Sequence, residues 1–339
     1  MKVALKPHMT KSVAAGVFLL AGVTAVGPLA VLEPCVSLSP AERRALESGG
    51  VVSRALPAND RQVALFAATR IAADADTFVT ATRAIADLKK SSFVVAIQRF
   101  SDPPKLADLD GLVPADRDIN ALAVCAIDDC SFKFTRNEIA AVVRTRTVSG
   151  TSRAVLEAAV RQVLFDRVTR YLSEGLGSLP PIENRGHARR WDETLAAMRA
   201  ESPCLTQFPP LAAWLSGDPP GGHDIESFVY WSYENYGAGK PVILITHVAI
   251  FRPSADSAIV VGKQLFASRY MDGGIAMTAL IAERATDAHY LVYLNRTSVD
   301  LLGGLLGGLK RSMLESRLEN EGSFIIDKLR ARLERSASE

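Results

Sequence analysis

The spacing of apolar residues predicts two groups of β-strands, one near each end of the chain. In both groups, apolar side chains recur at the two-residue period of a strand or form short runs bounded by turn residues. The first group comprises 51–56, 62–71 and 93–100. The second group comprises 242–251, 258–270, 274–283 and 289–296. Short turns join the strands of the second group, which is typical of an antiparallel sheet.

Helical spacing of apolar residues predicts three longer helices. One follows the second strand at 76–89, and the strongest covers 151–175, where a glycine ends the periodic pattern. The last begins near Ser298 or Asp300 and continues toward the end of the chain, either unbroken or interrupted at Gly322. A long helix that follows the sheet in sequence is expected to pack on the concave face of that sheet.

The sequence therefore predicts a single α+β domain over 51–335. Its parts are a curved antiparallel sheet, a long C-terminal helix and a mainly helical central insertion at about 103–239. Within the insertion, the aromatic-rich stretch 224–236 is expected to pack the inserted helices onto the sheet or to line an apolar pocket. Residues 33–50 are interpreted as a linker that contains a short amphipathic segment.

The N-terminal 32 residues have the pattern of an export signal. Lys2, Lys6 and Lys11 precede an uncharged apolar run at 13–26, as in the charged and hydrophobic regions of a signal peptide. No clear cleavage site follows, so an uncleaved membrane anchor is the alternative. We expect an exported protein, either periplasmic or held at the inner membrane by this segment, with no other contact with the membrane.

The cysteines fit an oxidising compartment. Cys125 and Cys130 bound a short polar loop, and such a pair in an exported protein is most simply a disulfide. The sequence leaves open whether Cys35 and Cys204 pair with each other or stay free. A metal site would need further ligands at suitable spacing, and none follows, so we predict no metal.

Composition and the absence of known motifs argue against several classes of function. The chain has 39 basic and 37 acidic residues and a net charge of +2, which gives no electrostatic basis for binding nucleic acid. No phosphate-binding glycine loop, dinucleotide fingerprint or nucleophile elbow is present. We therefore predict no cofactor and no catalytic residue, and an enzymatic role stays uncertain. The oligomeric state cannot be inferred.

The layout resembles the START-like, or helix-grip, fold, in which a curved antiparallel sheet wraps around a C-terminal helix. The resemblance rests on the strand and helix at 62–88, the strands at 242–296 and the helix start at 298–310. The chain is also similar to exported bacterial proteins of the cell envelope. The START-like resemblance implies a hydrophobic cavity between helix and sheet that holds a lipid, sterol or polyketide-like molecule; some members catalyse cyclisation or hydrolysis.

Five residues are candidate ligand contacts. His247, Gln264 and Asn295 are polar residues inside predicted strands, where buried polar groups must find hydrogen-bond partners. Gly304 and Gly308 belong to a cluster of four glycines near one side of the first turns of the predicted last helix, which would leave room for a ligand or a partner helix. For His247 the alternative is a core histidine, and for the glycines it is close helix packing or a loop.

Three functions follow as hypotheses. The first is a binding protein for a lipid or another hydrophobic small molecule, with a cavity of roughly 300–1,000 Å³. The second is a protein of the envelope that acts through protein–protein contacts, with an exposed apolar patch on the insertion. The third is a cyclase-like or hydrolase-like enzyme in which His247 faces a cleft beside another polar group.

Overall fold

The computed structural model describes residues 28–337, apart from 60, 185–186, 218–224, 236–239, 284–287 and 303–306. The export signal lies outside these residues, except for its last part at 28–32. Among the described residues, no helix is long and apolar enough to cross a bilayer.

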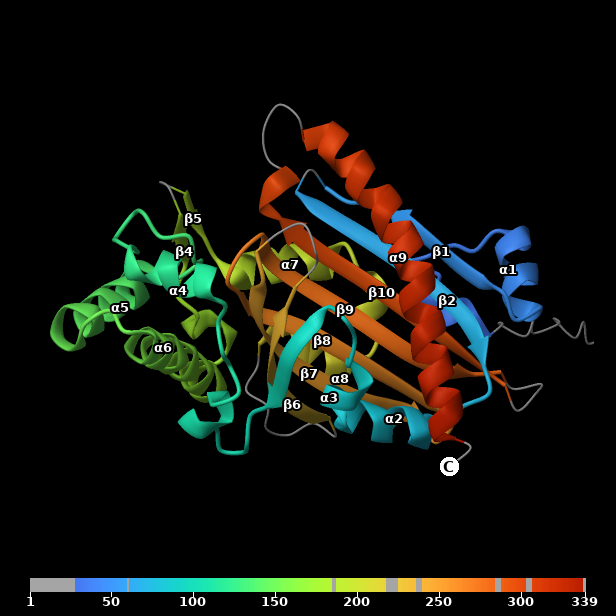
Figure 1. Cartoon of the computed structure of the whole chain (residues 1–339). Coiled ribbons are helices and arrows are strands. Elements are labelled where there is room, and N and C mark those ends of the chain that lie inside the picture. The colour runs from blue at the N-terminus through green and yellow to red at the C-terminus, as the bar shows by residue number, and fades with distance from the viewer. Residues whose placement is uncertain are drawn as a thin grey trace, which may run out of the picture.

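An eight-stranded sheet forms the centre of the molecule, in the order β1-β2-β10-β9-β8-β7-β6-β3 (Figure 1). Every neighbouring pair is antiparallel. The strands are β1 (Val51–Leu56), β2 (Gln62–Ile71), β3 (Val94–Arg99), β6 (Glu226–Glu234), β7 (Val242–Ser254), β8 (Ser257–Ala267), β9 (Met271–Ala282) and β10 (His289–Val299). The predicted α+β class and antiparallel sheet are thus confirmed.

The C-terminal helix α9 (Gly307–Ser336) crosses one face of the sheet and packs mainly on β1 and β2 (Figure 1). It follows a short 3-10 turn, η5 (Asp300–Leu302), so it begins later than predicted. The helix continues through Gly322 without a break. A Cβ at Gly322 would lie 2.5 Å from Ser53 Oγ and 3.0 Å from Leu65, so this glycine lets the helix approach the sheet closely.

Two short helices lie on the same face as α9. They are α2 (Ala75–Arg83) and α3 (Ile85–Leu88), which replace the single helix predicted at 76–89. Asp74 caps α2 by accepting a hydrogen bond from the Thr77 backbone N–H. Phe78 of α2 shares a buried cluster with Ile326 and Leu333 of α9, which joins these helices to one core.

The insertion between β3 and β6 covers the opposite face and forms the larger core. Its main helices are α4 (Asp116–Ala123), α5 (Arg136–Ser149), α6 (Arg153–Glu174), α7 (Trp191–Ala200) and α8 (Pro209–Ser216). Its smaller elements are η2 (Leu106–Leu109), η3 (Leu176–Ser178), η4 (Pro203–Leu205) and the hairpin of β4 (Ile182–Asn184) and β5 (His187–Arg189). The helical central insertion is confirmed in this range.

The aromatic-rich stretch of the insertion is a strand rather than a helix or loop. Residues Glu226–Glu234 form β6, which pairs with β3 and β7. Its side chains alternate between the two faces: Phe228 and Tyr230 pack toward α9, whereas Trp231 and Tyr233 join the core under the insertion. The insertion therefore ends before β6, and the predicted boundary at 239 is corrected.

The segment 33–50 is packed against the domain. It contains the helix α1 (Pro40–Glu47), and Val36, Leu38 and Leu46 are buried in the larger core. Just before it, the 3-10 helix η1 (Pro28–Leu32) contacts β9. The segment therefore packs against the domain and is more than a linker.

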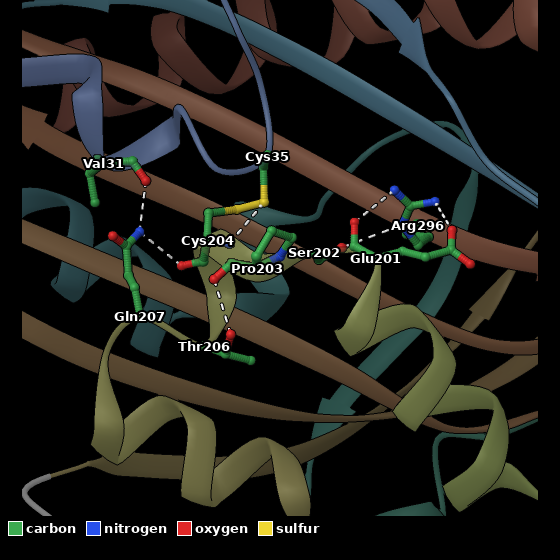
Figure 2. Close-up of a disulfide and its surroundings, with 9 residues drawn as sticks. All are labelled: Val31, Cys35, Glu201, Ser202, Pro203, Cys204, Thr206, Gln207 and Arg296. Atoms are coloured by element: carbon green, nitrogen blue, oxygen red, sulfur yellow. Dashed lines mark hydrogen bonds and ion pairs between the residues drawn. A yellow bond between two sulfur atoms is a disulfide. The ribbon is translucent and has the colours of Figure 1, made fainter.

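Two disulfides are present and leave no free cysteine among the described residues. The predicted pair Cys125–Cys130 is confirmed. Cys35 bonds to Cys204 of η4, across 169 residues (Figure 2). Beside this bond, the Gln207 amide donates to the Val31 and Cys204 carbonyls. The disulfides indicate an oxidising, exported environment.

Candidate functional site

The two faces of the sheet differ in how completely they are covered. On the α9 face, α9 lies over β1 and β2, while α2 and α3 approach β8 and β3 (Figure 1). Between these helices, several residues of β7, β8, β9 and β10 are neither fully buried nor fully exposed, among them Val260, Tyr293 and Thr297. Six others are small or carry an uncharged hydroxyl or amide, and we call these six the polar floor: Thr246, Gly262, Gln264, Ala276, Thr278 and Asn295.

Strand register places the polar floor on one continuous surface. Asn295 is directly opposite Ala276, which in turn is opposite Gly262, and Thr246 is opposite Gln264. Residues opposite each other in an antiparallel pair point to the same side. All six residues are small or carry an uncharged hydroxyl or amide, so the floor is polar without net charge.

Gln264 has an unsatisfied acceptor on this floor. Its Nε2 donates to Met271 Sδ at 3.5 Å, while its Oε1 is inaccessible to solvent and has no hydrogen-bond partner. The Oε1 lies toward Gly274, where an added Cβ would be 3.6 Å away. A buried acceptor without a partner destabilises the molecule by roughly 1–3 kcal/mol, and because solvent does not reach Gln264 Oε1, a ligand on this surface does not reach it either.

One side of α9 borders the polar floor. At its C-terminal end, Arg332 donates to the backbone carbonyls of Asp87 and Leu88, which places this side of α9 toward α3. Ile325 and Leu318 precede Arg332 by one and two heptads and therefore lie on about the same side of the helix. Ile325 is 43% exposed and Leu318 is half-buried, while Glu321 and Lys328 follow on the same stripe, so this side of α9 is amphipathic.

The opposite wall, near α3 and β6, contains a closed polar network. Lys89 donates to Glu234 Oε1 at 2.8 Å and to the Tyr230 hydroxyl at 3.2 Å. Ser232 Oγ donates to the same Glu234 oxygen at 2.6 Å. The positive charge of Lys89 is therefore neutralised by a carboxylate within the structure.

His247 lies on the other face of the sheet, under the insertion. Its Nδ1 is 2.7 Å from the Tyr171 hydroxyl of α6, and its ring packs 4.9 Å from the Trp214 ring of α8. Lys263 is directly opposite His247 and donates to the Trp214 carbonyl at 2.7 Å. His247 is only 2% exposed and Lys263 only 1%, so helices and not a cleft cover this pair.

Burial determines the ionisation of His247. Loss of hydration disfavours the imidazolium ion, and the positive charge of Lys263 adds to this effect, so the pKa of His247 falls to about 3. The imidazole is neutral near pH 7. Together with its buried surroundings, this state favours a role in packing the insertion onto the sheet.

A second buried polar cluster fastens the insertion to one end of the sheet. Lys133 Nζ is 2.7 Å from Asp272 Oδ1 and 2.5 Å from Asp300 Oδ1, and Arg189 Nη1 lies 3.3 Å from the other Asp272 oxygen. Burial raises the pKa of Asp300 above its usual range, while Lys133 partly opposes this shift. The two carboxylates and two cations balance one another's charge, although Asp272 Oδ2 accepts no hydrogen bond.

A small cavity lies on the insertion face, beside the Cys35–Cys204 disulfide. Its volume is about 20 Å³, which is room for about one water molecule. Arg296 lines it and pairs with Glu201 at 2.7 Å, next to Ser202 (Figure 2). A lipid would not fit in this cavity.

The structure separates the candidate residues predicted from the sequence. Gln264 and Asn295 lie together on the polar floor, whereas His247 lies on the opposite face. Gly308 is in the first turn of α9, and Gly304 lies outside the described residues. Sequence analysis missed Thr246, which lies in the apolar run of β7, and Thr278, although polar or small residues alternate with apolar ones along β9.

Within the described residues, no group of three histidine, cysteine or acidic side chains is placed to hold a metal ion.

Comparisons with known proteins assign no family to the chain. No protein-family model matches the chain, and neither does any curated protein or solved structure.

Proposed function

We propose that this protein is an exported binding protein that holds an amphipathic, lipid-like molecule between α9 and the polar floor. The observation that carries the proposal is the polar floor itself. Six partly buried residues lie in the middle of the sheet, on the face opposite the insertion. Leu318 and Ile325 of α9 would contact a hydrocarbon chain, and the floor would contact a polar group.

The topology supports a START-like fold as part of this proposal. Two short helices connect β2 to β3, and α9 is the next long element after β10, following the short turn η5. Strands β2 and β3 flank the five consecutive strands β6–β10. This is the layout that the resemblance implies, with β1 and the insertion as additions. The ligand in such folds lies between the long helix and the sheet, which corresponds here to the polar floor.

We further propose that the protein acts in the periplasm or at the inner membrane. The disulfides support an oxidising compartment, and the apolar run at 13–26 supports export. A protein in this place could hold or transfer membrane-derived molecules without a cofactor.

Native mass spectrometry of the protein purified from its own envelope tests the proposal. We expect a lipid-like molecule to co-purify at near one-to-one stoichiometry. Ala276→Phe should abolish this binding because a bulky ring would fill the polar floor. Ala255→Phe, in the exposed turn between β7 and β8, is the matched control and should keep the ligand. Equal ligand occupancy in both variants would rule out this site.

A second candidate function is protein–protein contact through the insertion. Val124 and Val148 are 76% and 85% exposed, which is high for apolar residues. Arg146, near the end of α5, donates to the Ala123 and Cys125 carbonyls and so joins the segments that carry both valines. Cross-linking in the envelope, compared between the natural chain and Val124→Asp/Val148→Asp, would test it: loss of a specific cross-link would support this function.

A further inference from the structure

The two edges of the eight-stranded sheet differ in how they are closed. Strand β1 forms one edge and β3 forms the other. At β1, the Ala55 N–H donates to Glu319 Oε1 at 3.0 Å, and Ser53 Oγ donates to the Glu319 carbonyl at 3.0 Å. Helix α9 thus satisfies polar groups along the β1 edge. A sheet edge that is left open presents backbone groups with which another strand can pair.

Strand β3 is such an open edge at Ile97 and Arg99. The Phe100 N–H donates to the Val229 carbonyl at 2.9 Å. Residues that bond to the neighbouring strand alternate along an antiparallel pair, so the N–H and C=O groups of Ile97 and Arg99 point away from β6. Among the described residues, no further strand pairs with β3, and no backbone group of another segment bonds to these four groups. The edge therefore offers two donors and two acceptors.

The strand has few of the features that usually protect an edge. Within 94–99, Arg99 is the only charged residue and no proline is present. A bulge between Val94 and Ala96 distorts the start of the strand, but the residues after it pair with β6 in regular register. The later part of β3 is thus a regular edge that favours pairing with another strand.

We infer that this edge pairs with the same edge of a second copy of the chain. The two β3 strands run antiparallel across a two-fold axis that passes beside Gln98. Ile97 of each copy then lies opposite the partner's Arg99, and each such pair exchanges two backbone hydrogen bonds. Four hydrogen bonds join the two sheets into one. This contact is separate from the polar floor and from the exposed valines of the insertion.

The side chains of β3 suit pairing with an identical strand. Gln98 lies at the axis and faces the partner's Gln98; its Oε1 is on the insertion face, 3.5 Å from the position of an added Cβ at Gly111. Two uncharged amides can bond to each other because each carries donors and an acceptor. Arg99 faces Ile97 and not another Arg99, so no like charges lie directly opposite one another.

Exposed apolar residues lie near both ends of the paired segment. Phe93 and Val95, before it, are 40% and 59% exposed, and Leu106 of η2, after it, is 42% exposed. The turn η2 contacts β3, so its leucine also lies near this edge. An antiparallel pair brings the start of one strand beside the end of the other. The apolar residues of the two copies therefore approach each other, and their burial favours the dimer.

Sedimentation equilibrium of the protein purified from its own envelope, over about 1–500 µM, tests the inference. We expect a reversible dimer with a Kd of roughly 10 µM, because the paired edge is short and the interface is therefore small. A chain that stays monomeric throughout this range would overturn the inference. Ligand binding at the polar floor does not enter this measurement, so the proposed function stands or falls separately.

Two variants locate the contact. Ile97→Pro removes a donor that faces away from β6, so the fold keeps its own hydrogen bonds while the symmetric dimer loses two. The Kd should rise at least about tenfold, with an unchanged circular dichroism spectrum. Val148→Asp, at an exposed position near the end of α5, is the matched control and should leave the Kd unchanged. A dimer that is equally tight in folded Ile97→Pro would overturn the inference.

A cysteine at the axis gives a second, independent measurement. In the proposed pair, Gln98 and the partner's Gln98 are about 4.5 Å apart at Cα, within the range of a disulfide. Under mild oxidation, Gln98→Cys should form a covalent dimer at least about tenfold faster than Val148→Cys, although position 148 is 85% exposed. Equal rates, or faster cross-linking at position 148, would show that the copies do not meet at β3.

Discussion

The disulfide between Cys35 and Cys204 should stabilise the fold far more than the one between Cys125 and Cys130. Their sequence separations are 169 and 5 residues, and a cross-link that closes a longer loop removes more entropy from the unfolded chain. The chain-entropy relation gives about 5 kcal/mol for the long loop and about 2 kcal/mol for the short one. The predicted difference in unfolding free energy is thus about 3 kcal/mol.

The comparison is well matched because the local surroundings are similar. One cysteine of each pair is buried, with Cys204 2% and Cys125 1% exposed. Shortening these side chains to alanine should therefore cost a similar amount in both pairs, and that part cancels. The measurement is equilibrium urea unfolding of Cys35→Ala/Cys204→Ala beside Cys125→Ala/Cys130→Ala, with unchanged slopes as the check on two-state behaviour. Equal losses, or a larger loss for the short loop, would refute the reasoning.

The buried charges give three further predictions. Lys133→Met should destabilise the fold by about 3–5 kcal/mol, since it leaves Asp272 and Asp300 without their shared cation; thermal unfolding measures this, and a loss below 1 kcal/mol would contradict it. The natural chain should lose stability as pH rises through the raised pKa of Asp300, because the folded chain holds the Asp300 proton more tightly than the unfolded chain. Asp300→Asn should remove this part of the pH dependence. His247 acts in the opposite direction: with its pKa lowered to about 3, stability should fall as pH drops below 6.5, by about 2 kcal/mol at pH 5. A urea midpoint whose pH dependence is the same in His247→Gln would contradict this assignment.

Most of the sheet was predictable because its strands carry long apolar runs. The predicted strand at 62–71 coincides with β2, and the predicted helix at 151–175 coincides with α6 apart from its ends. Strand β6 was hidden because aromatic and apolar residues fill both of its faces, so no alternation distinguishes it. Helix α5 was also missed, since only Ile139 and Val142 are buried in it.

A local signal for α5 was nevertheless present. Thr135 and Glu138 form a capping box, in which each side chain accepts from the backbone N–H of the other. This pattern of Thr-x-x-Glu marks a helix start even where the apolar stripe is narrow.

The candidate site was only partly predictable. Gln264 and Asn295 were recognised as polar residues within strands, but their common face depends on how β8, β9 and β10 pair. Sequence alone grouped them with His247, which lies on the opposite face. A bulge between Ile245 and Thr246 also shifts the register of β7 against β8. Pairing and bulges are set by tertiary contacts, which one sequence does not display.

The order of the strands has a consequence for how the chain reaches its folded state. Strands β6–β10 pair with their neighbours in sequence, so this part of the sheet needs only short loops to close. Strand β3, in contrast, is an edge strand that pairs with β6, where Arg99 is opposite Tyr230, so the whole insertion lies between the two strands in sequence. Strand β2 likewise pairs with β10, which is far away in sequence. During synthesis, β2 and β3 therefore emerge long before β10 and β6, whereas β1 and β2 emerge together. We expect the C-terminal third to act as the template on which the earlier strands assemble, so that a chain lacking β6–β10 would retain only the hairpin of β1 and β2 from this sheet.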